Sequence, residues 1–458
     1  MAGTGSSTAG RSRLLVVAIL ASFIAFLDGS IVTVALPALS ADLGGGLPTQ
    51  QWAVNAYLLT LGALILLAGS LSDSYGRLKI LRIGLIGFGA ASVACALAWD
   101  PGILILARAV QGMTAALLVP GSLALITTAY QEPERSRAIG RWTAWTGTAA
   151  IIGPLLGGIL VDWVSWRLIF AVNVVPVTAT LFLMAGLQDS AARRRTALDI
   201  PGALLAVAGL GGPVYALIEQ ERLGWGHPAV VVPLVVGTVA LVLFVLREAR
   251  TPAPMMPLSL FRARNFRYGN LVTAAAYGAI SLGSFGVTVF IQEAGGFSAT
   301  EAGFAALPLP VAMLLLSTQF GKLAGIYGPR LFMTVGPLIC GSGFLLMLTV
   351  PPPLNFLTQL LPGLLLFSLG LAVMVAPLTA AVLGALNETD AGIGSAVNNA
   401  VSRVAGLITV ALIGTISAGS LDYAGFQRTV LATALLMFAA ALIAFLGIRT
   451  PERDGSPA

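Results

Sequence analysis

The chain has 458 residues, of which 57% are hydrophobic and only 10% are charged, and its mean hydropathy is +0.92. A soluble domain carries about 25% charged residues, so this composition excludes an ordinary water-soluble protein and predicts a lipid bilayer as the surroundings. The net charge of +6 does not predict nucleic-acid binding, because the Arg residues stand in short runs between apolar stretches, as in membrane proteins. Cys95 and Cys340 both lie in apolar stretches and are expected to be core residues rather than a disulfide.

The first apolar run follows Arg11 and Arg13, as the apolar region of a signal peptide would. A signal peptide's apolar region is shorter and uncharged, whereas this run contains Asp28 and continues to Leu36. The run is therefore predicted to be a retained transmembrane helix.

Further apolar stretches recur along the chain, each long enough to cross about 30 Å of hydrocarbon. They predict fourteen transmembrane helices, at 14–38, 51–71, 80–98, 101–126, 139–161, 167–187, 200–219, 229–246, 268–292, 301–321, 331–349, 355–378, 391–417 and 428–448. The loops between them are short, and none is long enough to hold a soluble domain.

The basic residues predict the orientation of these helices. If the N-terminus lies in the cytoplasm, about 20 of the 25 basic residues fall on that side, and the outer loops keep only Arg167, Arg222 and Arg428. Arg403 is assigned to the first turns of a helix that starts inside. The pattern predicts a multi-pass protein of the bacterial inner membrane with both termini in the cytoplasm.

Two cytoplasmic loops share one pattern, which indicates an internal repeat. Residues 69–77 and 321–330 both read G-x-L-x-x-x-Y-G, followed closely by Arg. Parallel repeats of this kind are typical of one class of transporter, although Gly-rich turns could also recur by chance. The predicted organisation is an N-terminal six-helix bundle, two inserted helices, a Pro-containing cytoplasmic linker and a C-terminal six-helix bundle, at 1–190, 191–250, 251–267 and 268–458.

Five short patterns follow one another in the first half. They comprise Leu27, Asp28, Ile31, Val32 and residues 34–37; Gly69, Leu71, Asp73, Gly76 and Arg77; Arg108, Gln111, Gly112 and Pro120; Gly153, Pro154, Gly157 and Gly158; and Trp166, Arg167, Phe170 and Asn173. On these residues the chain resembles the major facilitator superfamily, and within it the fourteen-helix drug:proton antiporters of the EmrB/QacA type. The resemblance implies an all-α polytopic fold of two six-helix bundles plus two inserted helices. Ser74, Ala149 and Gly325 depart from the usual patterns and weaken inferences about gating.

Asp28 and Arg108 are the predicted proton-coupling residues. Asp28 lies midway through the first span, where a carboxylate costs roughly 2.5–3.5 kcal/mol on insertion scales. Counting residues along the two helices places Arg108 at the same depth, roughly 20 Å from the inner face. The hypothesis is a switchable pair in which protonation of Asp28 releases Arg108. The alternatives are a neutral Asp28 that only locks packing and a permanent structural ion pair.

Two further groups are assigned to conformational change. The resemblance implies that Asp73 and Arg77, with Gly76 between them, latch the two halves in the outward-facing state. Pro154 removes a helix hydrogen bond, and Gly153, Gly157 and Gly158 allow close backbone contact. This predicts a bend that packs against the opposite half and seals one side. The alternatives are a solvated turn for Asp73 and simple packing for the glycines.

Candidate cavity residues are polar side chains in or near the spans. They are Thr33, Asn55, Thr60, Gln111, Ser281, Ser284, Asn398 and Asn399, with Glu219 and Glu293 at the outer mouth. Several of them could instead bond neighbouring helices, and the two glutamates could simply be solvated. With few buried charges, the cavity is expected to be apolar and to suit hydrophobic or amphipathic molecules.

These features together predict a proton-coupled exporter of drugs or metabolites that acts as a monomer. No phosphate-binding loop of the G-x-x-x-x-G-K-[ST] type occurs in the sequence, so the proton gradient is the expected energy source and neither a cofactor nor a metal is expected. The alternatives are a dedicated self-resistance exporter of one metabolite and an importer or facilitator. An intramembrane enzyme is disfavoured, because clustered His, Cys or paired carboxylates are missing from the spans.

Overall fold

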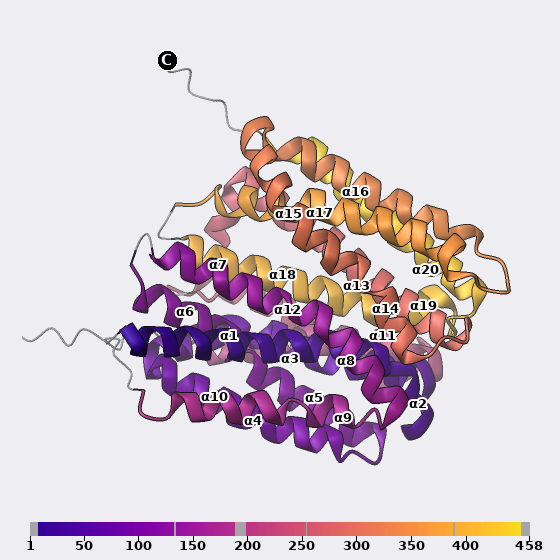
Figure 1. Cartoon of the computed structure of the whole chain (residues 1–458), viewed down its shortest axis with the longest axis horizontal. Helices are drawn as coiled ribbons and strands as arrows, with labels where there is room; N and C mark the ends of the chain where they lie inside the picture. The colour runs from indigo at the N-terminus through magenta and orange to yellow at the C-terminus, as the bar shows by residue number, and fades with distance from the viewer. Residues whose placement is uncertain (1–7, 132–133, 188–197, 253, 388–389, 450–458) are drawn as a thin grey trace, which may run out of the picture.

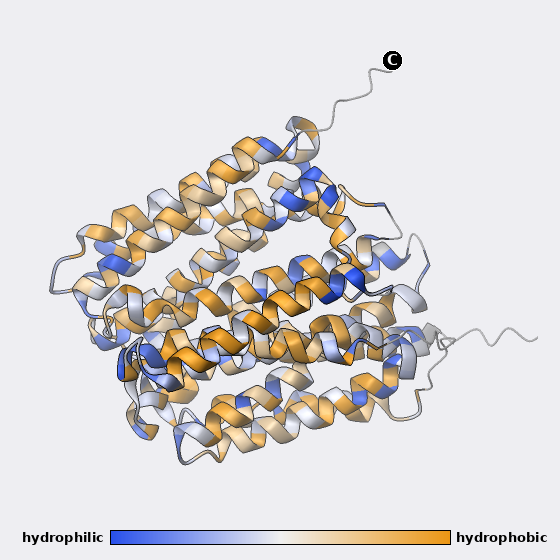
Figure 2. Cartoon of the chain, turned by 180° about the vertical axis from the view of Figure 1, so that it is seen from behind, coloured by the Kyte–Doolittle hydropathy of each residue, from blue (hydrophilic) through white to orange (hydrophobic). Residues whose placement is uncertain are grey.

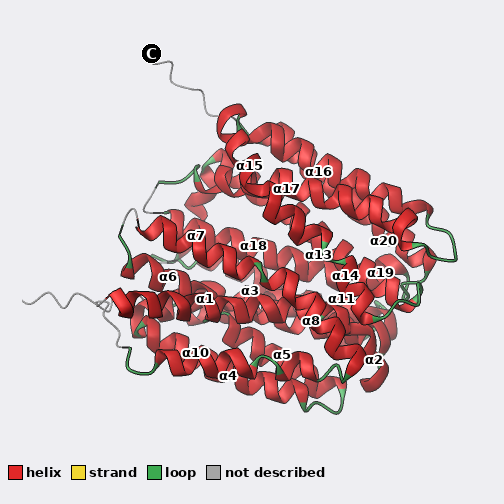
Figure 3. Ribbon diagram, in the orientation of Figure 1, coloured by secondary structure: helices red, strands yellow, loops and turns green. Residues whose placement is uncertain are grey.

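The computed structural model describes residues 8–131, 134–187, 198–252, 254–387 and 390–449. All regular secondary structure in these ranges is helical, as Figure 3 shows by colour. The helices run roughly side by side along the long axis of the molecule (Figure 1). The fold of the described residues is thus all-α, as predicted.

The first half contains ten α-helices and one short 3-10 turn, several of which are two pieces of one crossing. The bounds are α1 Thr8–Ile31, η1 Thr33–Ala35, α2 Leu36–Leu43, α3 Gly46–Tyr75, α4 Arg77–Ala96, α5 Pro101–Ala115, α6 Val119–Ala129, α7 Glu134–Gly147, α8 Ala149–Trp163, α9 Leu168–Ala171 and α10 Val174–Met184. The Asp100 side chain caps the start of α5 through the backbone N–H groups of Gly102 and Ile103. Asp100 thereby helps to fix the start of the helix that carries Arg108.

The inserted pair comprises α11 Ile200–Leu223 and α12 Pro228–Arg250. Asp199 caps α11 and forms an ion pair with Arg247 of α12 at 2.7 Å. Burial alone would raise the pKa of Asp199, but the hydrogen bonds from Arg247 and from the Gly202 N–H outweigh it and hold that pKa below its usual range. The ion pair ties together the ends of the two inserted helices that the predicted topology places in the cytoplasm.

The inserted pair also contacts both halves. Trp52 of α3 donates its indole N–H to Glu219 Oε1 at 3.1 Å, and Gln220 Nε2 donates to Thr415 Oγ1 at 2.9 Å. Thr415 belongs to the second half. The hairpin therefore bridges the two halves near the end that the predicted topology places outside.

The described residues of the second half are also helical. Its elements are η2 Leu258–Arg262, α13 Arg264–Glu293, α14 Ala299–Ala305, α15 Pro308–Tyr327, α16 Pro329–Leu346, η3 Met347–Thr349, η4 Phe356–Leu360, α17 Leu361–Leu383, α18 Ala391–Ala411, α19 Ile413–Ser417 and α20 Tyr423–Gly447. Its core is rich in aromatic contacts, such as the stacked rings of Phe290 and Phe426. The predicted division into two bundles and an insert remains a prediction about folding units.

Twelve helices of the described residues are long and apolar enough to cross a membrane, so the fourteen predicted spans are not all confirmed. The prediction at 167–187 falls on the short apolar segment Leu168–Met184, which is broken between α9 and α10. The prediction at 391–417 falls on α18 and α19, which break at Leu412 and carry polar residues such as Asn398 and Arg403. Figure 2 shows the apolar middle of the bundle and the hydrophilic residues gathered toward its two ends.

The two halves are joined at the end that the topology places outside. Asp162 of α8 accepts the backbone N–H groups of Ala299 at 3.1 Å and Thr300 at 2.8 Å, and Gln50 donates to Glu293 at 2.6 Å. Gln51 donates to the carbonyl of Val410 at 2.9 Å. Among the described residues, these and the Gln51 bond to Ala411 are the direct hydrogen bonds between the halves. The halves thus meet at that end, whereas α7 and α15 lie apart at the other end (Figure 1).

Candidate functional site

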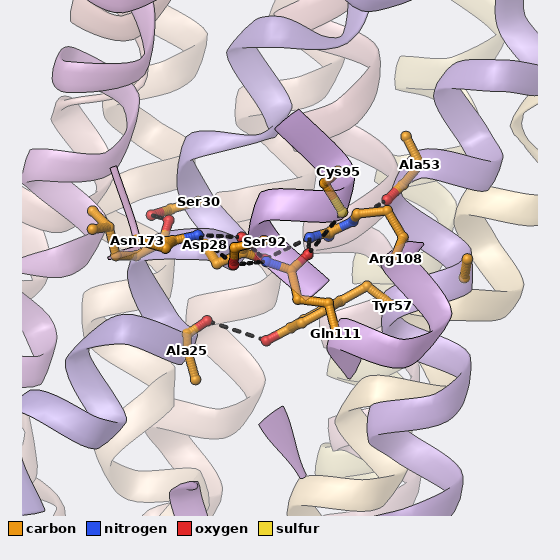
Figure 4. A network of polar contacts seen from close by, with 12 residues as sticks. Ala25, Asp28, Ser30, Ala53, Tyr57, Ser92, Cys95, Arg108, Gln111 and Asn173 are labelled. Atoms are coloured by element: carbon orange, nitrogen blue, oxygen red, sulfur yellow. Dashed lines mark hydrogen bonds and ion pairs between the residues drawn. The ribbon is translucent and has the colours of Figure 1, made fainter. Parts of the chain in front are cut away.

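Asp28 of α1 and Arg108 of α5 form an ion pair inside the first half. Arg108 Nη1 donates to Asp28 Oδ2 at 2.6 Å, and the two side chains are 0% and 2% exposed. The structure therefore brings together the two residues that the sequence placed at equal depth. Figure 4 shows the pair at the centre of a polar network.

Asp28 is also held by two amide side chains. Gln111 Nε2 donates to Asp28 Oδ1 at 2.8 Å, and Asn173 Nδ2 donates to the same oxygen at 2.9 Å. Ser92 of α4 accepts from Gln111 at 2.8 Å. The carboxylate thus connects α1 with α5 and α10. A proton on Asp28 would remove charge and acceptor capacity from these bonds and loosen all three helices from one another.

The guanidinium group of Arg108 contacts several groups besides Asp28. Besides Asp28, it donates from Nη1 to Gln111 Oε1 at 2.6 Å and from Nε to the Ala53 carbonyl at 2.8 Å. Its guanidinium carbon lies 4.4 Å from the Tyr57 ring centroid and 5.6 Å from that of Phe170. These aromatic rings exclude water and favour the cation at the same time. The pair is therefore sealed rather than hydrated.

Sequence reasoning found only part of this network. Gln111 was assigned to the substrate cavity, whereas the structure places it, fully buried, between Asp28 and Arg108. Asn173 belonged to a family pattern but had no assigned role, and Ser92 and Tyr57 carried no signal. Asn173 is an amide side chain flanked by apolar residues within a predicted span, and this pattern could have indicated a buried polar contact.

The loop residues assigned to a latch act within the first half in this conformation. Arg77 pairs with Asp73 at 2.8 Å and donates to the Ala124 carbonyl of α6 at 2.8 Å. Gly76 has φ +104°, a left-handed conformation that favours glycine. Among the described residues, no hydrogen bond or ion pair links Asp73 or Arg77 to the second half. Their role in the outward-facing state stays a prediction.

The glycines of α8 pack against two different elements, α1 in the same half and residues 299–300 in the opposite half. A Cβ at Gly153 would overlap Ser30, and one at Gly157 would overlap Ile31, so both pack on α1 of the same half. A Cβ at Gly158 would overlap the backbone of Ala299 and Thr300 in the opposite half.

Pro154 also meets the opposite half. A Cβ at Gly303 of α14 would overlap the Pro154 carbonyl. Only Pro154 and Gly158 of the predicted set therefore face the outer junction between the halves.

The predicted cavity residues of the first half mostly bond to backbone. Thr33 donates to the Ser30 carbonyl, and Thr60 donates to the Ala109 carbonyl of α5 at 2.7 Å. Asn55 is fully buried, and neither of its amide atoms has a hydrogen-bond partner. Thr60 thus joins two helices, while Asn55 keeps unused bonding capacity.

Some predicted cavity residues of the second half contact neighbouring helices, and one, Ser284, lines a cleft. Asn398 donates to Asn270 and Thr273 of α13, which joins two helices. Ser281 lies against Gly406 of α18. Ser284 lines a cleft between α13 and α17, and Asn399 approaches Arg403 Nε at 3.4 Å.

The polar lining groups of that cleft are Ser284, Thr288 and Ser368, and most of the remaining wall is apolar, including Phe344 and Phe367. In this conformation the cleft is small, and its lining is mostly apolar, as the sequence predicts for the cavity.

Glu219 and Glu293 are engaged rather than free. Glu219 bonds Trp52 and pairs with Arg222 at 3.0 Å. Glu293 accepts from Gln50, which bridges the halves. In this conformation Glu293 belongs to the outer junction and not to an open mouth. Asp162, which the sequence analysis did not consider, contributes to the same junction.

Removing one partner of the buried pair should destabilise the protein. We expect Arg108→Met to cost about 3 kcal/mol, because it leaves Asp28 without its cation. The double variant Asp28→Leu with Arg108→Met should recover most of that loss, since no buried charge remains. Thermal unfolding of the purified protein in detergent measures both effects. An Arg108→Met variant that is as stable as the unmodified chain would contradict the expected role of the pair in stability.

Comparisons with known proteins show what the chain is similar to. Residues 18–410 match the Major Facilitator Superfamily. The chain is 37% identical to the puromycin resistance protein pur8 of Streptomyces alboniger, over 89% of this chain and 82% of that protein. It is 34% identical to the cephamycin export protein CmcT of Amycolatopsis lactamdurans, over 91% and 87% respectively.

A multidrug resistance protein, Stp of Mycobacterium tuberculosis, is 34% identical over 87% of this chain and 74% of its own length. Among solved structures, the peptide transporter POT in complex with sulfate superposes with a TM-score of 0.69 and 16% identity. That match covers 95% of each chain and shows the likeness of the fold.

Proposed function

Because the chain belongs to the major facilitator superfamily, we propose that it is a proton-coupled antiporter that exports hydrophobic or amphipathic drugs or metabolites. The chain is a multi-pass membrane transporter with twelve apolar membrane-crossing helices among its described residues. Its relatives are named for antibiotic resistance or export, which supports outward transport.

The observation that carries proton coupling is the sealed Asp28–Arg108 pair. The carboxylate of Asp28 is fully buried and is paired with Arg108. Burying a charged side chain within a membrane protein costs free energy, and such residues are retained where they have a function. Protonation of Asp28 from outside would weaken its bonds to Arg108, Gln111 and Asn173. Those bonds join helices, so the change in charge is coupled to helix packing.

The energetics are sufficient without ATP. A proton gradient supplies about 2.3 kcal/mol per 100 mV for each charge that crosses. In the proposed cycle, Asp28 takes a proton from outside, and releases it inside before cargo binds. The exchange needs neither a cofactor nor a metal.

Several finer points belong to the same proposal. We place the chain in the fourteen-helix EmrB/QacA-type group, with α9 and α10 forming one further crossing and α18 and α19 the other. The relatives and the distribution of Arg support a bacterial inner-membrane location with both termini in the cytoplasm. We propose that the monomer is the transporting unit.

A dedicated exporter of one metabolite is the second candidate. The names of two relatives each refer to one kind of antibiotic, puromycin and cephamycin, which favours such a role, whereas a third is named for multidrug resistance. An importer or facilitator on the same scaffold remains the further alternative.

Everted membrane vesicles test the proposed function. With the vesicle interior acidified, vesicles that contain the chain should accumulate members of a panel of cationic, neutral and acidic fluorescent drugs. Accumulation should stop when an uncoupler collapses the gradient, because proton movement drives it. A single accumulated compound would identify the dedicated exporter. Accumulation that is unchanged at equal pH and voltage would refute proton coupling.

A further inference from the structure

A second arginine, Arg403, lies about midway along the helical path formed by α18 and α19. It stands twelve residues after the start of α18 at Ala391, which at 1.5 Å per residue is about 18 Å along the helix. The helical path continues through α19 to Ser417 on the other side. Arg403 thus lies in the fourth turn of α18, deeper than the first turns to which the sequence assigns it.

Arg403 has no acidic partner among the described residues. Its Nε approaches Asn399 Oδ1 at 3.4 Å, and its guanidinium carbon lies 5.9 Å from the ring centroid of Phe26. No carboxylate oxygen in the described part of the chain lies within the 4.0 Å ion-pair distance of its nitrogens. Arg108, by contrast, is fully compensated by Asp28. An uncompensated cation in this position is costly and marks an ion or substrate pathway.

Arg403 stands where the two halves face each other. Its Cβ would lie 3.4 Å from a Cβ at Gly62 of α3, and Phe26 is two residues from Asp28 on α1. Phe26 of α1 and Gly62 of α3 thus place the first half directly beside this cation of the second half.

The face of α18 around Arg403 is partly open. Arg403 and Asn399 are half-buried, and Gly392 and Ser395, nearer the cytoplasmic end of the same helix, are exposed. In the described part of the chain, the direct hydrogen bonds between the halves lie at the outer end, away from Gly392 and Ser395. A cation, an amide and an aromatic ring are therefore found together on a partly exposed face of α18.

We propose that Arg403 binds an acidic group of the cargo, a carboxylate or a sulfonate. Guanidinium groups bind such anions through two parallel hydrogen bonds, and Asn399 is placed to add a third donor. Phe26 would contact the apolar body of the same molecule. This inference rests on the proposed export function and narrows it to amphipathic anions.

Binding of two matched probes tests the assignment. Pyrenebutanoate and its primary amide share one ring system and differ in charge at about pH 8. Fluorescence anisotropy with the purified full-length chain in detergent should show that the acid binds about ten-fold more tightly than the amide. Arg403→Gln should remove that preference by weakening the acid alone, and Arg403→Lys should keep part of it.

Arg428→Gln is the matched control, because this arginine lies at the outer end and donates to the Ser417 carbonyl. It should leave the preference for the acid intact. The inference is overturned if the unmodified chain binds the amide as tightly as the acid, if Arg403→Gln keeps the full preference, or if neither probe binds. The exporter proposal is judged separately, by whether vesicles accumulate any member of the drug panel.

Discussion

Asp28→Asn should abolish proton-driven export while the protein stays in the membrane, although the unpaired Arg108 should also lower its stability. Asparagine has nearly the shape of aspartate and can still accept from Gln111 and Asn173, but it cannot take up or release a proton. We expect drug accumulation in everted vesicles to fall by about 10²-fold or to background, since a positioned proton-transfer group contributes about 10²-fold or more. The measurement is the initial rate of accumulation, normalised to the amount of protein in the vesicles.

Two controls separate loss of coupling from loss of structure. Asp100→Asn changes an acid that only caps α5 and should reduce the rate by less than about two-fold, since the asparagine side chain is an equally good cap. Exchange of cargo across vesicles without a proton gradient should survive in Asp28→Asn, because that exchange needs no proton step. If Asp28→Asn exported cargo at the rate of the unmodified chain, Asp28 would not be the proton carrier.

Gly158→Leu should lock the transporter out of the conformation seen here. Even a Cβ at Gly158 would overlap the backbone of Ala299 and Thr300, and backbone cannot yield as a flexible side chain can. The two halves then cannot close at the outer end, so the chain would stay open to the outside. We expect export to fall to background, together with faster labelling of a cysteine introduced at Gln50, which the closed junction buries.

Gly147→Leu is the matched control for this variant. Gly147 ends α7 in the same predicted span, and a Cβ there would meet nothing within 4 Å. Export by Gly147→Leu should stay within about two-fold of the unmodified chain, because a surface substitution usually changes stability by less than about 0.5 kcal/mol. Normal export by Gly158→Leu would mean that closure of this junction is not part of the cycle.

The pairing of Asp28 with Arg108 was predictable because a helix has a fixed rise per residue. Once both spans and their directions were assigned, the depth of each side chain followed from counting residues. The same reasoning failed for Gln111, which has the right depth for a cavity but faces Asp28. It also gave no partner for Asn173, because depth alone does not say which side of a helix meets which neighbour.

Two of the fourteen predicted spans show a different limit. The segment at 391–417 is long enough to cross a membrane, yet its polar residues and the break at Leu412 keep it below the apolar threshold that the other twelve meet. Hydropathy detects helices that lipid surrounds better than helices that line a polar space. The polar side chains that weaken the signal, Asn399 and Arg403 among them, are the ones that the further inference uses.

The sequence by itself determined the lipid environment, the helical class, the duplicated loops and the presence of one acid in the first span. Composition and the distribution of Arg express these properties directly, since transfer of apolar and charged groups between water and lipid depends little on neighbouring helices. Only the tertiary structure decided how each helix is rotated. In lipid, apolar residues suit both the packed face and the lipid face, so the pattern does not fix that rotation. Side-chain packing sets it, and with it the bonds of Asp28, the outer junction at Gly158 and the uncompensated position of Arg403.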